Sequence, residues 1–230
     1  MSTLPRTIAI DGPAASGKST TAKLVAERLG FVHLDTGAMY RAITLKCLRQ
    51  GVDPHDTARI DQLVKSTHVQ LRRESGVMRV LLDGEDVTDE IRSVEVTRAV
   101  SAISSLRSVR QAMVREQRRM GETGSVVAEG RDIGTVVFPD ADLKFFVIAG
   151  IEARARRRQK DLRQQGVDTS LAEIERAIRE RDALDSSREE SPLRKADDAI
   201  ELDTSDMTIE QQVEFVIGRV RRLQKRDEAS

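Results

Sequence analysis

Short apolar runs and longer amphipathic stretches alternate along most of the chain. Apolar runs that stop at Gly, Pro or Asp are typical of buried strands, and apolar residues every three or four positions are typical of helices. The first strand is predicted over residues 7–10, before Asp11-Gly12-Pro13. Further core strands are predicted over 31–34, 125–128, 143–148 and 198–202, and helices over 18–29, 38–49, 94–120, 152–165, 170–188 and 209–223.

One segment breaks this alternation. Residues 68–72 and 77–82 alternate like strands and are separated by Glu74-Ser75-Gly76, a hairpin signal. We therefore expect a small antiparallel insert over residues 63–93 within a core domain of residues 1–62 and 94–230. The strand–helix alternation elsewhere predicts a three-layer α/β fold, in which helices cover both faces of a five-stranded parallel sheet.

Composition excludes several function classes. The 230 residues include 38 basic and 38 acidic ones, so a nucleic-acid binder that relies on a bulk positive field is disfavoured. With no Trp and one Tyr, stacking platforms for single-stranded nucleic acid are scarce. The single Cys excludes an intramolecular disulfide and fits a reducing cytosol. No signal-peptide core or membrane-length apolar run is present, so we expect a soluble cytoplasmic protein without membrane or nucleic-acid partners.

A phosphate-binding motif follows the first predicted strand. Residues 12–19 read Gly-Pro-Ala-Ala-Ser-Gly-Lys-Ser and fit the P-loop pattern G-x-x-x-x-G-K-[ST]. Small residues let consecutive backbone N–H groups surround phosphate oxygens at the N-terminus of the next helix. Lys18 is expected to reach the β- and γ-phosphates, and the Ser19 hydroxyl to ligate Mg²⁺. The residues predicted to bind the nucleoside triphosphate are Gly12, Pro13, Ala14, Ala15, Ser16, Gly17, Lys18, Ser19, Thr20 and Arg157.

The other motifs of a P-loop switch protein are missing. A switch GTPase normally carries Asn-Lys-x-Asp for guanine, which this chain lacks. The predicted strand over 143–148 is followed by Ala149-Gly150 rather than by a metal-holding Asp. A guanine-nucleotide switch is therefore disfavoured.

Arginines gather at the ends of predicted strands and on the late helices. Arg41 and Arg131 follow the second and third strands, where loops at the carboxyl edge of a parallel sheet line the ligand crevice. Arg181, Asp185 and Arg188 share one helix face at i, i+4 and i+7. Taken singly, each could be a solvated surface residue or an exposed ion pair. Together they suit a second anionic ligand that faces the triphosphate.

A dense cationic cluster precedes Gly166. Arg154, Arg156, Arg157 and Arg158 lie so close that their like charges repel unless an anion lies among them. We therefore expect a mobile Arg-rich lid over residues 152–168 that covers the γ-phosphate. A solvated charge run is the alternative.

Three further segments carry a resemblance to a known family. They are Asp35-Thr36-Gly37-Ala38-Met39-Tyr40-Arg41, the run from Glu129-Gly130-Arg131-Asp132 to Phe138-Pro139, and Glu180-Arg181-Asp182. With the P-loop, they resemble the bacterial cytidylate kinases in order and spacing from about residue 6 to 223. The resemblance implies a P-loop fold with an acceptor-binding insert, and phosphorylation of CMP and dCMP by ATP with Mg²⁺ as cofactor.

The resemblance also implies roles for individual residues. Arg41 and Arg131 hold the acceptor phosphate, Ser101, Arg110, Asp132 and Arg188 read cytosine, and Arg181 and Asp185 contact the sugar. The implied substrate-binding set is Thr36, Tyr40, Arg41, Ser101, Arg110, Arg131, Asp132, Arg181, Asp185 and Arg188, and the implied catalytic set is Lys18, Arg41, Arg131 and Arg158. The acceptor phosphate is itself the nucleophile, so we expect no general base. We also expect a monomer.

Two alternatives stay open at this point. The same fold could phosphorylate another nucleotide or a small anionic metabolite such as shikimate, which a screen of acceptors would decide. The chain could also be a nucleotide-dependent switch or binding module without phosphotransfer. The missing guanine motif and the acceptor-side arginines argue against that second alternative.

Overall fold

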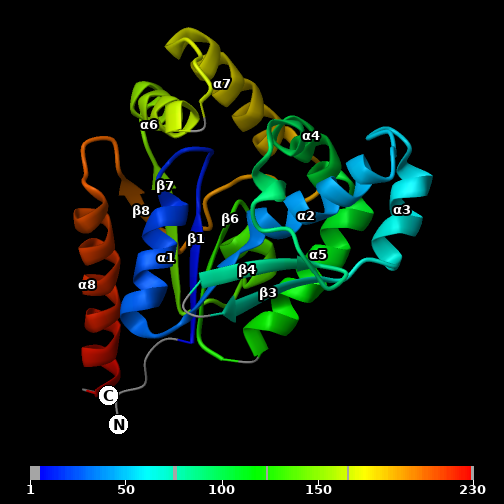
Figure 1. Cartoon of the computed structure of the whole chain (residues 1–230). Helices are drawn as coiled ribbons and strands as arrows, with labels where there is room; N and C mark the ends of the chain where they lie inside the picture. Colours follow the sequence, from blue (N-terminus) through cyan, green and yellow to red (C-terminus); the bar gives the residue numbers. More distant parts are fainter. Residues whose placement is uncertain (1–5, 75–76, 123, 165, 229–230) are drawn as a thin grey trace. The chain divides into compact units, whose positions relative to one another are not determined.

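The computed structural model describes residues 6–74, 77–122, 124–164 and 166–228. The chain divides into two compact units. We call the part up to His33 and from Gly124 onward the sheet unit, and the part from Leu34 to Thr123 the helical unit. Figure 1 labels the elements of both.

A five-stranded parallel sheet forms the centre of the fold and confirms the predicted α/β class. Its strand order is β2-β6-β1-β7-β8. Residues at the centre of β1 and throughout β6 are buried, as in parallel sheets covered on both faces. The strands are β1 (Thr7–Asp11), β2 (Val32–Asp35), β6 (Val126–Gly130), β7 (Leu143–Ile148) and β8 (Ile200–Asp203).

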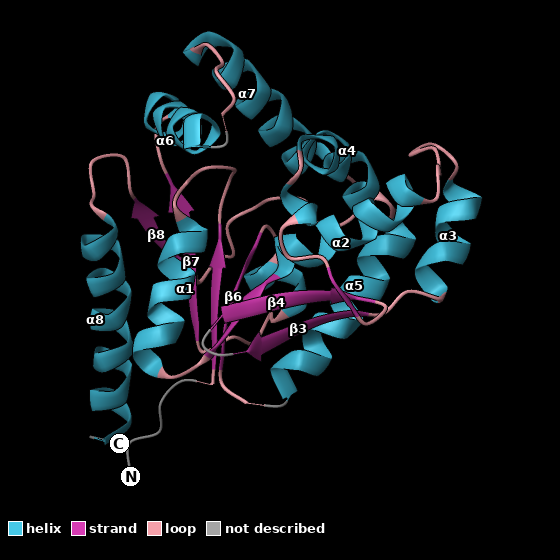
Figure 2. Ribbon diagram, viewed as in Figure 1, coloured by secondary structure: helices cyan, strands magenta, loops and turns pink. Residues whose placement is uncertain are grey.

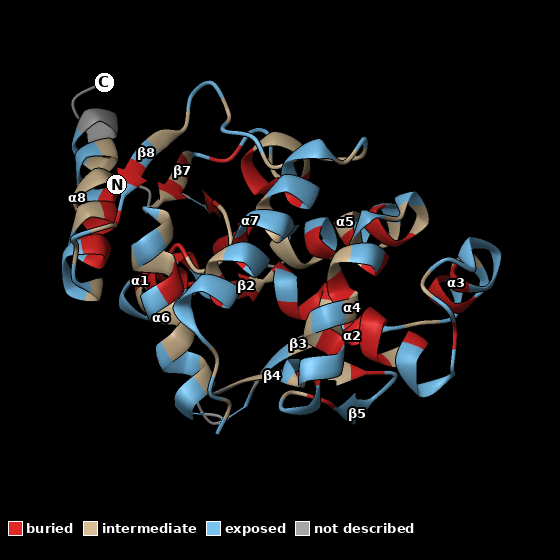
Figure 3. Cartoon of the chain, turned by 90° about the horizontal axis from the view of Figure 1, so that it is seen from above, coloured by how far each residue is buried: buried red, intermediate tan, exposed pale blue. Residues whose placement is uncertain are grey.

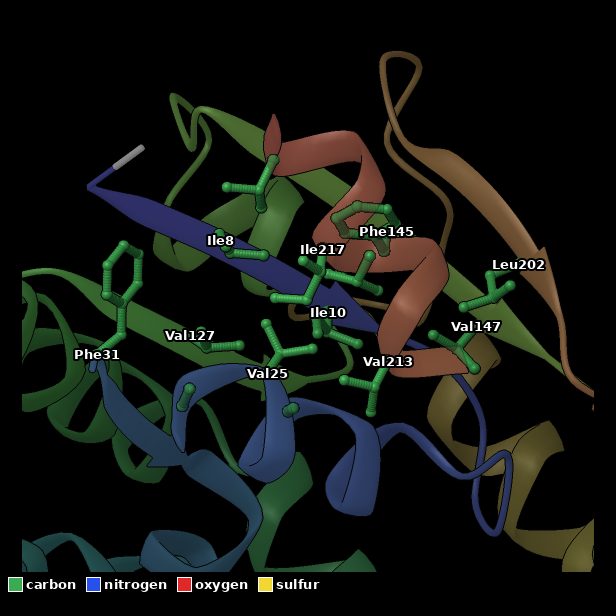
Figure 4. Packing of buried hydrophobic residues seen from close by; sticks show 14 residues of the cluster. Ile8, Ile10, Val25, Phe31, Val127, Phe145, Val147, Leu202, Val213 and Ile217 are labelled. Carbon is green, nitrogen blue, oxygen red and sulfur yellow. The ribbon is translucent and has the colours of Figure 1, made fainter. Parts of the chain in front are cut away.

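Helices α1 (Lys18–Leu29) and α8 (Ile209–Glu228) pack on each other and on one face of the sheet (Figure 2). Helix α1 ends at Gly30, whose left-handed backbone (φ 69°) closes the last turn by hydrogen bonds to Ala26 and Glu27. The core between these layers contains Ile8, Ile10, Val25, Phe31, Val127, Phe145, Val147, Leu202, Val213 and Ile217 (Figure 4). Alternate residues of β1, among them Asp11, therefore point to the opposite face.

Three more helical segments complete the sheet unit. Helices α6 (Ile151–Gln164) and α7 (Leu171–Ser187) pack on each other through Ala155, Ile174 and Ile178. A π-helical segment (Ile133–Val137) follows β6, which the sequence did not predict. Single π-turns of this kind are common at functional sites.

The helical unit contains the predicted antiparallel hairpin. Strands β3 (Val69–Glu74), β4 (Val77–Leu82) and β5 (Glu85–Asp86) form a three-stranded sheet, with Leu71 opposite Val80. Around it lie α2 (Thr36–Arg49), α3 (Thr57–Lys65), a 3₁₀ turn (Glu90–Arg92), α4 (Val94–Ser105) and α5 (Arg107–Glu122). The buried positions of α2 are red in Figure 3. An acceptor-binding role for residues 63–93 stays a prediction, and the compact unit that carries this sheet is larger than that segment.

Two elements of the helical unit differ from the prediction. The single helix expected over 94–120 is wrong, because the backbone is extended at Leu106 (ψ 132°). The hydroxyls of Ser104 and Ser105 donate to carbonyls of their own helix, which weakens its last turn. Helix α3 was missed, although Asp56 caps it by accepting a hydrogen bond from the Arg59 N–H at 3.1 Å.

No described helix combines the length and the apolar character needed to cross a membrane.

The central position of Phe145 gives a stability prediction. Its side chain is buried and meets Phe215 edge to face, with ring centroids 6.4 Å apart. Phe145→Ala should lower the free energy of unfolding by about 3–5 kcal/mol, because it removes core contacts and leaves a cavity. Urea titration measures this change. Leu184→Ala is the control, since Leu184 is 58% exposed, and an equal loss in both variants would contradict this account of the core.

Candidate functional site

The loop between β1 and α1 is built as an anion cradle. Ala15 (φ 58°) and Gly17 (φ 91°) adopt left-handed backbone on either side of Ser16, as in the anion-binding nests of main-chain N–H groups. A Cβ on Gly12 would lie 2.1 Å from the Val147 carbonyl oxygen, so only glycine fits there. Helix α1 begins directly at Lys18, and its N-terminus adds the positive end of the helix dipole.

Ser16 and Lys18, two polar residues of the phosphate-binding motif, are buried. The Ser16 hydroxyl has no hydrogen-bond partner among the described residues, although Ser16 is fully buried. The Lys18 ammonium donates to the Pro13 carbonyl at 3.2 Å and is nearly buried itself. Thr20 is exposed in the first turn of α1. A buried hydroxyl and a buried ammonium beside a nest of N–H groups suit a phosphate chain.

Glu129 is a candidate site residue that the sequence reasoning missed. The Ser19 hydroxyl donates to its carboxylate at 2.5 Å, and His33 Nε2 lies 3.3 Å from the other carboxylate oxygen. Burial raises the pKa of Glu129, but the contacts with His33 and Ser19 and the Lys18 charge outweigh it and hold this pKa below its ordinary value. Glu129 therefore stays ionised in a buried position.

The carboxylate suited to a metal lies on a different strand from the one that the sequence suggested. Strand β7 is followed by Ala149-Gly150, whereas Glu129 is the second-last residue of β6, on the other side of β1. An acidic residue at the carboxyl end of a fully buried apolar strand was the available signal. A carboxylate and a hydroxyl are oxygen ligands of the kind that Mg²⁺ takes together with phosphate oxygens. Among the described residues, no cluster of three or more His, Cys, Asp or Glu forms a separate metal site.

Three predicted acceptor-side arginines meet around Asp185 within the sheet unit. Arg131 Nε lies 2.7 Å from Asp185 Oδ2, and Arg188 Nη1 lies 3.6 Å from Oδ1. Burial raises the pKa of Asp185, but the charges of Arg131, Arg181 and Arg188 outweigh it and lower this pKa. Asp132, also buried, follows Arg131 directly. Three guanidinium groups near one carboxylate supply the charge-assisted hydrogen-bond donors that bind carboxylate or phosphate groups in proteins.

The arginines of the expected lid are mostly held by the chain itself. Arg154 pairs with Asp182 and donates to the Ala14 carbonyl at 3.3 Å, and Arg156 pairs with Glu152 at 3.0 Å. Carboxylates of the chain itself, Asp182 and Glu152, therefore lie among these charges, and Arg154 and Arg156 need no bound ligand to separate them. Arg158 is partly buried and forms no ion pair with another described residue. Its catalytic role and the lid itself stay predictions.

Arg157 links the phosphate loop to the end of β8. Its guanidinium donates to the Ser16 carbonyl at 3.3 Å and to the Thr204 hydroxyl at 3.1 Å, and it also contacts the Thr204 carbonyl. The buried Thr204 hydroxyl donates in turn to the Ser16 carbonyl at 2.8 Å. A shallow groove of about 440 Å³ opens beside this contact, and its lining is Asp203, Ser205, Asp206, Met207 and Gln211.

The helical unit holds the remaining predicted substrate residues. Arg41 Nη1 donates to the Thr97 hydroxyl at 2.9 Å, and Ser101 lies one turn beyond Thr97 on α4. The Arg110 guanidinium stacks over the Tyr40 ring, 5.2 Å from its centroid. Thr36 is buried at the start of α2, and the neighbouring Asp35 caps that helix by accepting the Ala38 N–H at 2.9 Å.

These contacts gather the predicted residues into two groups, one in each unit. The sheet unit brings together the phosphate loop, Glu129 and the arginines around Asp185. The helical unit brings together Tyr40 with Arg110, and Arg41 with α4. The substrate roles of all these residues stay predictions.

Comparison with known proteins agrees with this chemistry. A family model described as "Cytidylate kinase" matches residues 8–222. The chain belongs to the cytidylate kinase family.

Named relatives in this family are close. A cytidylate kinase of Bacillus thuringiensis (strain Al Hakam) is 48% identical over 213 residues, which are 93% of this chain and 95% of that protein. A bifunctional pantoate ligase/cytidylate kinase of Synechococcus sp. (strain CC9902) is 54% identical over 212 residues, or 91% of this chain, but the chain spans only 44% of that protein. Membership of the cytidylate kinase family therefore rests on sequence over nearly the whole chain.

The charge balance at Asp185 gives a pH prediction. Because its folded-state pKa is lowered, Asp185 stabilises the fold above its ordinary pKa of 3.8 and loses this contribution as the pH falls through the folded value. Asp185→Asn should lower the free energy of unfolding by about 2 kcal/mol at pH 7, since the arginines lose their carboxylate. Urea titrations should show that this difference in free energy of unfolding between wild type and variant is unchanged from pH 7 to 5 and becomes smaller below about pH 4.

The matched control for this measurement is Asp197→Asn, which removes an exposed carboxylate from the same unit. Its stability should follow that of the wild type at each pH. If the difference in free energy of unfolding between wild type and Asp185→Asn became larger on acidification, the stabilising role of the Asp185 carboxylate would be contradicted.

Proposed function

We propose that the chain transfers the γ-phosphoryl group of ATP to CMP and dCMP, giving ADP with CDP or dCDP. The observation that carries this proposal is the arginine group around Asp185, held in the same unit as a complete phosphate loop. A loop alone supports binding of a triphosphate, whereas a second buried cationic group supports a second anionic nucleotide.

We propose that ATP binds with its phosphates on the loop of residues 12–19. The unpartnered Ser16 hydroxyl, the Lys18 ammonium and the N-terminus of α1 supply donors for the phosphate oxygens. The groove beside Thr204 adjoins the same loop through Arg157 and has room for the nucleoside part of the donor. Ser19 and Glu129 would hold Mg²⁺, which when bound neutralises charge on the β- and γ-phosphates.

On the acceptor side, we propose that Arg131 and Arg41 bind the phosphate of CMP, with Arg181 and Asp185 at the sugar. Asp132 would accept a hydrogen bond from the cytosine 4-amino group. Uracil presents a carbonyl oxygen at that position, so a carboxylate repels it. Thr36, Tyr40, Ser101, Arg110 and Arg188 would complete the acceptor site.

The proposed reaction needs no general base, because a phosphate oxygen of the acceptor is already an anionic nucleophile. The chemical problem is instead the repulsion between two polyanions. Lys18 and the acceptor-side arginines offset this repulsion and stabilise charge on the transferring phosphoryl group, and Arg158 would act there with them. Burial of these groups strengthens each interaction, since water screens it less.

We further propose that the enzyme works as a monomer in the cytoplasm. The one cysteine, Cys47, is buried and unpaired, which fits a reducing compartment.

A screen of acceptors tests the proposed function. ADP release from ATP and Mg²⁺ should depend on CMP or dCMP, and should fall at least tenfold with UMP. AMP, GMP and shikimate should give no more ADP than a sample without acceptor. Turnover that needs no acceptor, or that prefers another one, would overturn the proposal.

The proposed reading of cytosine by Asp132 gives a specificity prediction. Asp132→Asn keeps the shape of the side chain but can present an amide N–H to the uracil carbonyl. The ratio of kcat/KM for CMP to kcat/KM for UMP should fall about tenfold or more. The exposed Asp140 provides the control Asp140→Asn, for which the ratio should not change. An unchanged ratio in Asp132→Asn would place cytosine recognition elsewhere.

A further inference from the structure

Asp11 makes a long-range contact that the proposed chemistry has not used. It ends β1, directly before Gly12 of the phosphate loop, and its side chain is nearly inaccessible to solvent. Asp11 Oδ1 accepts the backbone N–H of Ile133, and Oδ2 accepts that of Gly134, both at 2.8 Å. One carboxylate therefore joins the start of the phosphate loop to the turn that follows Arg131 and Asp132.

The contact replaces a local helix cap. Ile133 and Gly134 begin the π-helical segment, where backbone N–H groups have no partner within the helix. Asp132 occupies the N-cap position but forms no capping hydrogen bond with its side chain. Because Asp11 satisfies these N–H groups, the Asp132 carboxylate does not have to turn back onto its own helix.

The surroundings of Asp11 destabilise its ionised form, and side-chain packing holds the turn that it contacts in place. The pKa of Asp11 is raised to about 6, because burial and the nearby charge of Asp132 raise it by more than the two backbone N–H groups and Arg131 lower it. From β7, the aliphatic stem of Lys144 packs at Gly134, while the Lys144 ammonium binds Asp198 at 2.8 Å. A buried carboxylate of raised pKa is unfavourable for folding, which is common where function requires it.

We propose that Asp11 is a positioning residue for acceptor recognition: its two hydrogen bonds to Ile133 and Gly134 set the direction in which Arg131 and Asp132 face the acceptor nucleotide. This inference rests on the proposed function, because it assigns the acceptor to Arg131 and Asp132. Asp11 itself contacts no substrate. It acts through the turn, so its loss should affect the acceptor far more than ATP.

The chain contains a matched control for Asp11. Asp142 Oδ2 accepts the backbone N–H groups of Arg6 and Thr7 at 2.9 and 2.8 Å. Asp142 thus anchors β1 by the same kind of hydrogen bond, but at the amino end of the strand. At the usual rise per residue of a strand, Thr7 lies about 13 Å from Asp11. In Asp11→Asn one of the two accepting oxygens becomes a donor that faces an N–H group. In Asp142→Asn both N–H groups can stay on the remaining amide oxygen, which is uncharged and a weaker acceptor.

The experiment compares both variants with the wild type in steady-state kinetics and in calorimetric titration with ATP alone. For Asp11→Asn we expect kcat/KM for CMP to fall at least tenfold and the CMP-to-UMP ratio of kcat/KM to fall with it. Its Kd for ATP should stay within threefold of the wild-type value. For Asp142→Asn all three quantities should stay within twofold of wild type, although the protein is less stable.

Two outcomes overturn the inference. One is a kcat/KM for CMP within twofold of wild type in Asp11→Asn. The other is an equal loss of ATP binding and acceptor use, which indicates a general loss of structure. If Asp11→Asn does not fold, Asp11→Glu tests the same contact, because the longer side chain keeps the charge but cannot place both oxygens on the Ile133 and Gly134 N–H groups without shifting the turn. Unchanged kinetics in a folded Asp11→Glu variant would then overturn the inference.

The wild-type screen separates this inference from the proposed function. If the wild type prefers another nucleoside monophosphate, the proposed function fails. The variants are then compared on that preferred substrate, and the same tenfold difference between Asp11→Asn and Asp142→Asn decides the positioning role. If the wild type uses no acceptor, both the function and the inference are overturned.

Discussion

Hydrogen-bond donors that are to bind an anion deep in a protein need an acceptor whether or not the anion is there. For several donors the sheet unit meets this constraint with its own carboxylates, whereas the buried Ser16 hydroxyl has no partner among the described residues. Asp185 lies on Arg131, Glu129 accepts from Ser19, and Asp182 accepts from the Ala14 N–H at 3.4 Å while pairing with Arg154. Because a buried donor without a partner costs free energy, these acidic residues keep the site folded in the absence of ligand.

In the proposed function, the phosphate groups of ATP would replace some of these carboxylates as hydrogen-bond acceptors. A carboxylate carries one negative charge, whereas the phosphate groups of ATP carry several, so a triphosphate competes effectively for an N–H such as that of Ala14. Around Asp185 the arrangement differs, since three arginines share one carboxylate and each guanidinium carries several N–H donors. The proposed ATP side therefore offers an N–H with a replaceable internal partner, and the proposed acceptor side offers guanidinium groups with several donors each.

The sequence was informative wherever structure depends on neighbouring residues. Buried apolar strands that stop at Asp or Gly, and the spacing of Gly12, Gly17 and Lys18, led to the correct sheet and to a phosphate loop of the expected form. Features that depend on distant partners were not accessible. The position of Glu129 near the end of a buried strand was visible in the sequence, but its hydrogen bond from Ser19, 110 residues away, was not. The partner of Arg154 likewise lies on another helix. The break at Leu106 was missed because apolar periodicity continues across it.

The link between Ser16 and Thr204 has a consequence for how the P-loop motif is interpreted. The eight residues of the motif lie near the start of the chain, yet a threonine 188 positions later bonds the Ser16 carbonyl, and Gln212 of α8 accepts from Thr21 of α1 at 2.7 Å. A gene copy that lost its last thirty codons would still be recognised by a motif search. Its product would lack the polar supports of the loop, so the intact motif would be a misleading sign of a working nucleotide site.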